Sequence, residues 1–151
     1  MTGRKFSFEA KATSKASAST LFRLATDGAN WKTWAKPLVV QSSWVRQGTP
    51  APGGIGAIRK LGMWPLLVQE ETVAYEQDRR HAYRLVNPAS PAKDYIGEVL
   101  LSPNASGGTD VVWRGSFVEG VPGTGPIIRA ALGSTIKMFV GKLIKAAEQQ
   151  S

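Results

Sequence analysis

Cysteine is absent from the sequence, and histidine occurs once, as His81, among 151 residues. Without cysteine the chain can form no disulfide bond, no thiolate metal ligand and no thiol nucleophile. A single histidine, with no carboxylate cluster at ligand spacing, gives no basis for a metal site, so we expect no metal and no other cofactor. The neighbours Arg79 and Arg80, at the start of a strand, favour a surface position for His81 over a catalytic one.

Long hydrophobic runs are also missing. No apolar run approaches the ~18–20 residues that a membrane-spanning helix needs. Residues 1–11 lack the apolar region of a secretory signal, so we expect a cytoplasmic protein. The length is typical of one domain with its own core, which we expect to comprise residues 1–151.

Acidic residues are scarce in the first half of the chain. Residues 1–69 contain ten lysines and arginines but only Glu9 and Asp27, and the net charge is +8. Such a half can indicate an acidic partner, nucleic acid or anionic lipid, but a solvated basic surface is favoured over a dedicated polyanion site. No dense basic cluster and no nucleic-acid motif are present, so we expect no nucleic-acid partner.

The longest helical pattern lies at residues 125–147. Apolar residues recur there at steps of three and four, which places them on one face of a helix. Pro126 suits the first turn, because the N–H group that proline lacks would have no partner there. The predicted apolar face consists of Ile128, Leu132, Ile136 (or Thr135), Phe139, Leu143 and Ala147 (or Ala146).

Two shorter helices are expected near the N-terminus. Ser14 or Ser17 can cap a helix that runs to about Ala25. A second, short helix carries Trp31 and Trp34, whose spacing places both indoles near one face and favours core anchors over ligand contacts.

Most of the remaining sequence has the two-residue period of β-strands, interrupted by turns rich in Gly, Pro, Asn and Asp. Short links between consecutive strands imply an antiparallel meander. Strands are predicted at residues 6–12, 39–46, 56–62, 66–76, 80–87, 93–102 and 109–119.

These elements predict an α+β fold in which one sheet packs against one long helix. A seven-stranded antiparallel sheet must bury one face, and only the final helix is long enough to cover it. We therefore expect a curved sheet wrapped around the C-terminal helix, with two short helices between strands 1 and 2. A sheet that curves around one helix makes a binding cavity between them plausible.

The turns suggest registers for two hairpins. One places Arg59 opposite Glu70, and the other places Gly97 opposite Trp113. Lys93 is then expected at the mouth of the cavity. The residues expected to face inward are Tyr83, Leu85, Tyr95, Gly97, Val99, Leu101, Thr109, Val111, Trp113, Gly115 and Phe117.

Arg59 and Glu70 allow two interpretations. Facing inward, they would be a polar anchor for a ligand's carboxylate, carbonyl or hydroxyl group. Facing outward, they would be an exposed cross-strand ion pair worth under about 1 kcal/mol. If they are buried together, Arg59 is expected to keep Glu70 ionised and therefore weakly basic.

Segments in the right order along the chain carry a family resemblance. The sequence resembles the START-like, helix-grip superfamily (SRPBCC) and, within it, the polyketide cyclase/dehydrase-like proteins. This resemblance implies the fold described above, a large cavity with loops at 62–66 and 87–92 over its mouth, and an inward orientation of Arg59 and Glu70. The segments lie at residues 18–34, 53–62, 68–85, 91–103, 107–117 and 122–132.

We expect the protein to bind a small, largely apolar ligand of the lipid, polyketide or isoprenoid type. Two alternatives remain open. One is a cyclase or dehydrase with Glu70 as base, Arg59 stabilising an enolate and tyrosines as donors, and the other is a co-chaperone-like interaction module. Trp64, at a loop tip, suggests peripheral membrane contact or a lid. The residues expected to contact the ligand are Arg59, Glu70, Tyr83, Tyr95, Trp113, Phe117, Ile136 and Phe139.

Overall fold

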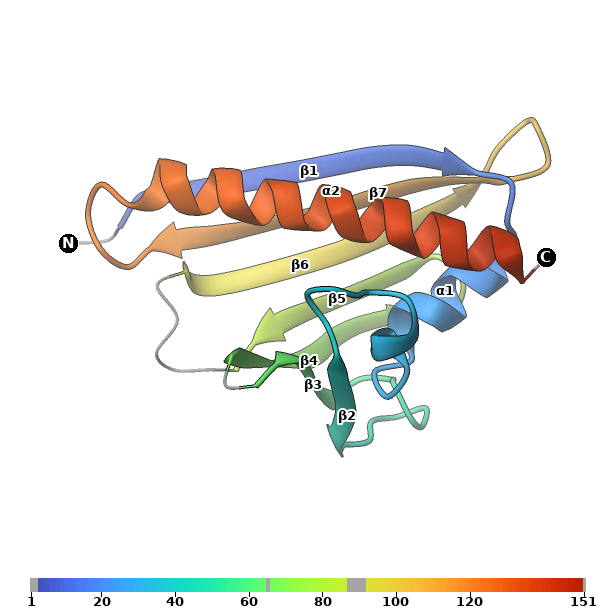
Figure 1. Cartoon of the computed structure of the whole chain (residues 1–151), viewed down its shortest axis with the longest axis horizontal. Coiled ribbons are helices and arrows are strands. Elements are labelled where there is room, and N and C mark those ends of the chain that lie inside the picture. Colours follow the sequence, from blue (N-terminus) through green and yellow to red (C-terminus); the bar gives the residue numbers. More distant parts are fainter. Residues whose placement is uncertain (1–2, 65, 87–91, 151) are drawn as a thin grey trace.

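The computed structural model describes residues 3–64, 66–86 and 92–150. Its seven strands form one antiparallel sheet in the order β1-β7-β6-β5-β4-β3-β2, and the C-terminal helix lies along β1 and β7 (Figure 1). The predicted helix-grip architecture is therefore confirmed. The elements are β1 (Lys5–Ser14), α1 (Ala18–Thr26), the 3-10 helix η1 (Trp31–Thr33), β2 (Gln41–Arg46), β3 (Ile58–Met63), β4 (Leu66–Glu76), β5 (Arg80–Leu85), β6 (Ala92–Pro103), β7 (Thr109–Glu119) and α2 (Gly125–Gln149).

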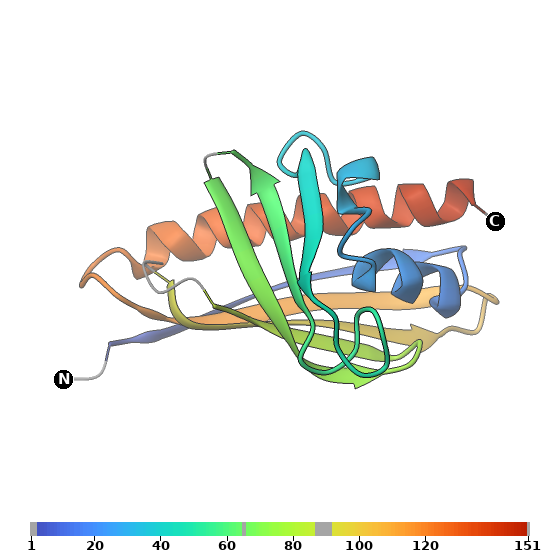
Figure 2. The same cartoon turned by 90° about the horizontal axis from the view of Figure 1, so that it is seen from below.

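The sheet curls around α2 rather than lying flat beneath it. Strands β1, β7 and β6 run along the helix, whereas β4, β3 and β2 rise steeply at its side (Figure 2).

The described part of the chain contains no helix with both the length and the apolarity needed to span a bilayer.

Helix α2 follows β7 after a short loop. The backbone N–H of Gly125 donates to the buried carboxylate of Glu119 at 3.0 Å, which places an anion at the positive end of the helix. Gly125 is also required for packing, because a Cβ there would overlap the ring of Phe6. The predicted apolar face is largely observed, since Ile136, Leu143 and Ala147 are buried and Ile128, Leu132 and Phe139 are partly buried. Val140, which is buried too, was not part of that prediction.

The N-terminal helices pack onto the sheet through aromatic side chains. Ser17 caps α1, with its hydroxyl accepting a hydrogen bond from the Thr20 N–H at 3.1 Å. Trp31 donates its indole N–H to the Ala25 carbonyl oxygen at 3.0 Å, which links η1 to α1. Its ring lies 4.6 Å from that of Trp34, and both indoles are buried in the core.

One predicted register is correct and the other is wrong by two residues. Arg59 does pair with Glu70, but Gly97 pairs with Gly115, and Trp113 pairs with Val99. The strands extend to Pro103 and Thr109, which moves the centre of the loop toward its C-terminal side. Because a two-residue shift preserves side-chain orientation, the predicted inner faces of β6 and β7 are still observed. Gly97 lies under the Tyr83 ring, where a Cβ would collide with it.

Two residues lie on the opposite side from the one expected. Lys93 is on the outer face, because the register shifts between Lys93 and Ile96 and Asp94 adopts a positive φ of 52°. His81 is only 1% exposed, because it shares the inner face of β5 with Tyr83. Its Nε2 atom lies 3.1 Å from the Thr72 hydroxyl. The expected loop at 87–92 lies, apart from its last residue, outside the described residues.

Candidate ligand-binding site

A pocket of about 240 Å³ lies between the inner face of the sheet and the middle of α2. It lies between α2 and strands β3, β4 and β5, and its walls are completed by Tyr95 of β6, Trp113 of β7, Trp31 of η1 and the segment after η1. Its walls are mainly apolar and aromatic, as in typical small-molecule sites. The lining residues are Trp31, Leu38, Val39, Leu61, Gly62, Leu66, Val68, Glu70, Tyr83, Leu85, Tyr95, Trp113, Leu132, Thr135, Ile136 and Phe139.

Three aromatic rings form one wall of the pocket. Phe139 stacks on Trp113 with ring centroids 6.0 Å apart, and it meets Trp31 edge to face at 5.3 Å. Trp31 and Trp113 contact each other in the same T-shaped manner at 5.7 Å. Because each ring is held by the other two, this wall is an ordered surface for a flat or apolar ligand.

Glu70 is the one charged side chain among the described residues that line the pocket. Its side chain is 12% exposed, and its Oε1 atom accepts a hydrogen bond from Arg59 Nε at 3.0 Å. Burial raises the pKa of Glu70 above its ordinary value, while the charge of Arg59 opposes this shift. Arg59 thus lowers the pKa of Glu70 as expected, but burial outweighs it, so the net shift of the Glu70 pKa is upward and not downward.

Arg59 lies behind Glu70 and is not among the lining residues. Its Nη1 atom donates to the Ala25 carbonyl oxygen at 2.7 Å, near the C-terminus of α1. Its guanidinium carbon lies 4.5 Å from the centre of the Trp31 ring and 5.2 Å from that of Tyr83. Arg59 therefore holds α1, Trp31 and Glu70 together, and its charge is shared among protein groups.

The two predicted tyrosines stand side by side on the pocket wall. The Trp113 indole N–H donates to the Tyr83 hydroxyl at 2.9 Å, and the ring centroids of Tyr83 and Tyr95 lie 6.3 Å apart. Burial raises the pKa of both phenols well above the ordinary value. Both therefore remain neutral donors and acceptors at physiological pH.

Phe117 lies apart from the other predicted site residues. It stacks on Phe6 with ring centroids 5.6 Å apart, in a filled part of the core. Six of the eight predicted residues line the pocket, while Arg59 supports it from behind and Phe117 is elsewhere. The six are Glu70, Tyr83, Tyr95, Trp113, Ile136 and Phe139.

Sequence reasoning missed the apolar residues of β3 and β4 in this pocket. Leu66 and Val68 alternate with Glu70 along β4, and Leu61 pairs with Val68. The register that places Arg59 opposite Glu70 contains this information, because residues two apart on a strand share a face. That signal could have identified all three.

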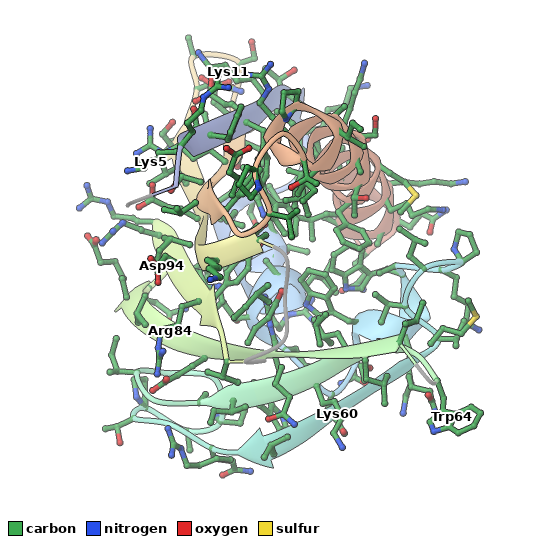
Figure 3. The ribbon with its side chains drawn as sticks, turned by 90° about the vertical axis from the view of Figure 1, so that its left-hand side faces the viewer. Lys5, Lys11, Lys60, Trp64, Arg84 and Asp94 are labelled. Carbon is green, nitrogen blue, oxygen red and sulfur yellow. The ribbon has the colours of Figure 1, made fainter. Side chains whose placement is uncertain are left out.

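Trp64 does not fold over the pocket as a lid. Its side chain is 74% exposed and projects from the end of the β3–β4 hairpin (Figure 3). Its backbone N–H donates to the side-chain oxygen of Gln41 at 2.9 Å.

In the part of the chain that the structure describes, no three His, Cys, Asp or Glu side chains gather as a metal site requires.

A family model described as "Polyketide cyclase / dehydrase and lipid transport" matches residues 5–148. The chain belongs to this family. The membership confirms the resemblance found in the sequence segments, although the family's description covers both enzymes and carriers and so does not assign one activity. No curated protein matches the chain in sequence.

Solved structures show the same fold at low sequence identity. A START superfamily protein from Mycobacterium smegmatis is 13% identical, with a TM-score of 0.79 over 96% of this chain and 99% of that one. An uncharacterized protein from Bacillus thuringiensis is 15% identical, with a TM-score of 0.74 over 93% and 98%. Ara h 8.0201 is 18% identical, with a TM-score of 0.71 over 97% of each chain.

Proposed function

We propose that this protein binds a compact, largely apolar molecule that presents a hydrogen-bond donor to Glu70. The observation that carries the proposal is the position of one carboxylate in the wall of an otherwise apolar and aromatic pocket. Family and fold support hydrophobic-ligand binding in general. The single carboxylate in the apolar pocket wall narrows the ligand to an apolar molecule with a hydrogen-bond donor.

The position of Arg59 behind Glu70 indicates which polar group the ligand carries. Arg59 lies behind the carboxylate and is engaged by Ala25, Trp31 and Glu70 itself. A ligand carboxylate would meet the carboxylate of Glu70 before the guanidinium, and two like charges at close range disfavour each other. A hydroxyl, phenol or amine would instead donate to Glu70. Arg59 thus positions the anchor and does not contact the ligand.

The size of the ligand follows from the pocket. A volume of about 240 Å³ is below the ~300–1,000 Å³ of typical small-molecule sites. It accommodates a one- or two-ring molecule or a short chain rather than a whole lipid. A longer ligand would extend past Leu66, which lines the pocket and is also exposed.

The test compares three probes with the same ring system: 2-naphthol, naphthalene and 2-naphthoate. We expect calorimetry or quenching of tryptophan fluorescence to give the order naphthol, naphthalene, naphthoate, from tightest to weakest. A charge-assisted hydrogen bond contributes ~1.5–3 kcal/mol, so naphthol should bind roughly 10- to 100-fold more tightly than naphthalene.

The decisive quantity is the naphthol-to-naphthalene ratio in variants. Glu70→Leu should reduce it to near unity, while Glu71→Gln should leave it unchanged, because Glu71 contacts Arg46 and Arg84 on the outer face. Circular dichroism would establish that both variants are folded. Tightest binding of naphthoate, or no binding of any probe, would contradict the proposal.

A second candidate function, proton abstraction within the same pocket, is favoured by the raised pKa of Glu70 beside two neutral phenols. A carboxylate made more basic by burial is suited to remove a proton next to a carbonyl, and a phenol can stabilise the resulting enolate. The probe is 2-tetralone in deuterated water, with hydrogen exchange followed by NMR. Faster exchange that Glu70→Gln abolishes would support an enzyme, and exchange at the uncatalysed rate would leave ligand binding as the function.

A further inference from the structure

Exposed apolar side chains surround the opening of the pocket. They come from the segment before β2 and from the end of the β3–β4 hairpin. Met63 pairs with Leu66, and the Val40 N–H donates to the Gly62 carbonyl oxygen at 3.0 Å, so the two segments are adjacent. Leu66 is 80% exposed and Trp64 is 74% exposed. We call this surface the apolar rim; it comprises Leu38, Val40, Met63, Trp64, Leu66 and Val68.

The apolar rim is continuous with the pocket. Leu38, Leu66 and Val68 are exposed to solvent and also line the pocket wall. A molecule that entered or left the pocket here would cross the rim. Exposed apolar surface of this extent at a pocket opening is typical of an interaction site rather than of a solvated loop.

The stretch of chain that contains the apolar rim, residues 28–69, carries charges of one sign. Residues 28–69 contain five lysines and arginines and no aspartate or glutamate. Two of the five are engaged, since Arg59 is buried and Arg46 pairs with Glu71. Among the described residues, no carboxylate forms an ion pair with the remaining three, Lys32, Lys36 and Lys60. Figure 3 shows Lys60 and Trp64 on the same lower side of the molecule.

We propose that the apolar rim docks onto the surface of an anionic lipid bilayer. Tryptophan favours the boundary between headgroups and acyl chains, and lysines near that boundary are attracted to anionic lipids. Trp64 and Leu66 enter the boundary, while Lys32, Lys36 and Lys60 contact the headgroups. Docking in this orientation places the pocket opening at the membrane, so an apolar ligand passes between them without crossing water.

A second copy of the chain fits this surface less well. Self-association through the rim would bring the same three lysines of each copy together, and residues 28–69 supply no carboxylate to compensate. An acidic protein would match the charge but not the protruding tryptophan and leucine. A bilayer with anionic lipid satisfies both features.

The test is co-sedimentation of the full chain with vesicles of phosphatidylcholine, with and without one quarter phosphatidylglycerol. We expect binding to the anionic vesicles, a blue shift of tryptophan fluorescence and weakening by added salt. Trp64→Ser should reduce binding by about tenfold or more. Exchanging Lys32 and Lys36 for glutamine should reduce binding to the anionic vesicles only.

The matched control is Ile127→Ser, because Ile127 is also 74% exposed but lies in the first turn of α2, away from the rim. Ile127→Ser should bind like the unaltered protein. The proposal is overturned if the unaltered protein does not bind anionic vesicles, or if Trp64→Ser and Ile127→Ser behave alike. A dimer in sedimentation velocity that Trp64→Ser dissociates would also overturn it, by identifying a second copy as the occupant. The naphthol series tests the pocket separately, since it requires no membrane.

Discussion

The side chains on the inner face of the sheet are buried in one half of the sheet and partly exposed in the other. In β7, which runs along α2, every second residue from Thr109 to Glu119 is buried. In β4, which rises at the side of the helix, the corresponding residues Leu66, Val68 and Glu70 are exposed or partly exposed. The difference teaches that the pocket is a consequence of curvature. Where the sheet follows the helix, side chains fill most of the space, and only Tyr95 and Trp113 of β6 and β7 reach the cavity. Where the sheet diverges from the helix, the same pattern of alternation lines the cavity.

Two phenylalanines make this contrast concrete. Phe117 is almost completely buried and stacks on Phe6 near the start of α2. Phe139 faces the sheet from the middle of the same helix, but it is only partly buried and lines the pocket. Both phenylalanines therefore face the interior, but Phe117 belongs to the filled core and Phe139 to the wall of the pocket.

The largest effect is expected from the filled half. Phe117→Ala should lower the free energy of unfolding by ~3–5 kcal/mol, the range for removing a core phenylalanine. Phe139→Ala should cost about half as much, because part of its surface already faces open space. Urea denaturation of the two variants measures the difference. Equal losses would show that the pocket wall is packed as tightly as the core and would break the comparison.

A smaller effect is expected from His81, which is buried on β5 at the boundary between the halves. Burial and the nearby charge of Arg59 lower its pKa well below 6.5, so it is neutral in the folded state and protonated in the unfolded state at acidic pH. Its contribution to stability is therefore present above pH 6.5 and is lost as the pH falls. The loss approaches ~1.4 kcal/mol per pH unit.

Glu70 titrates in the opposite sense, because its pKa is raised in the folded state. Its cost to stability is absent below pH 4.5 and grows as the pH rises through the folded-state pKa. The difference between the unaltered protein and His81→Asn isolates the histidine. Urea denaturation between pH 7.5 and 5.5 should show the difference shrinking toward acid, and a constant difference would contradict a neutral, buried His81.

The smallest effect is expected on the solvent side of α2, which belongs to neither half. A Cβ at Gly141 would meet no atom within 4 Å. Gly141→Ala should therefore stabilise the protein by roughly 0.5–1 kcal/mol, through the helix preference of alanine. Thermal unfolding measures this baseline. A loss of stability would mean that this face of α2 contacts something beyond the described residues.

Hydrophobic periodicity and short turns predicted much of the fold, because each depends only on residues close together in the sequence. The period of two assigned the inner faces of β6 and β7, even where the register of Gly97 was off by two residues. The pairing of Arg59 with Glu70 followed from a short hairpin. His81 was wrongly predicted to lie at the surface because Arg79 and Arg80 precede it in the sequence. On strand β5, successive side chains point to opposite faces, so an exposed arginine can be followed by a buried histidine.

The sequence by itself determined the order of the elements, the face that each strand buries and the helix that covers the sheet, because periodicity acts within a few residues. Only the tertiary structure decided where sheet and helix separate. That distance depends on curvature summed over seven strands, which no short segment contains. It placed Phe117 in the core, Phe139 at the pocket and Arg59 behind Glu70, and so decided which of the inward-facing residues a ligand can reach.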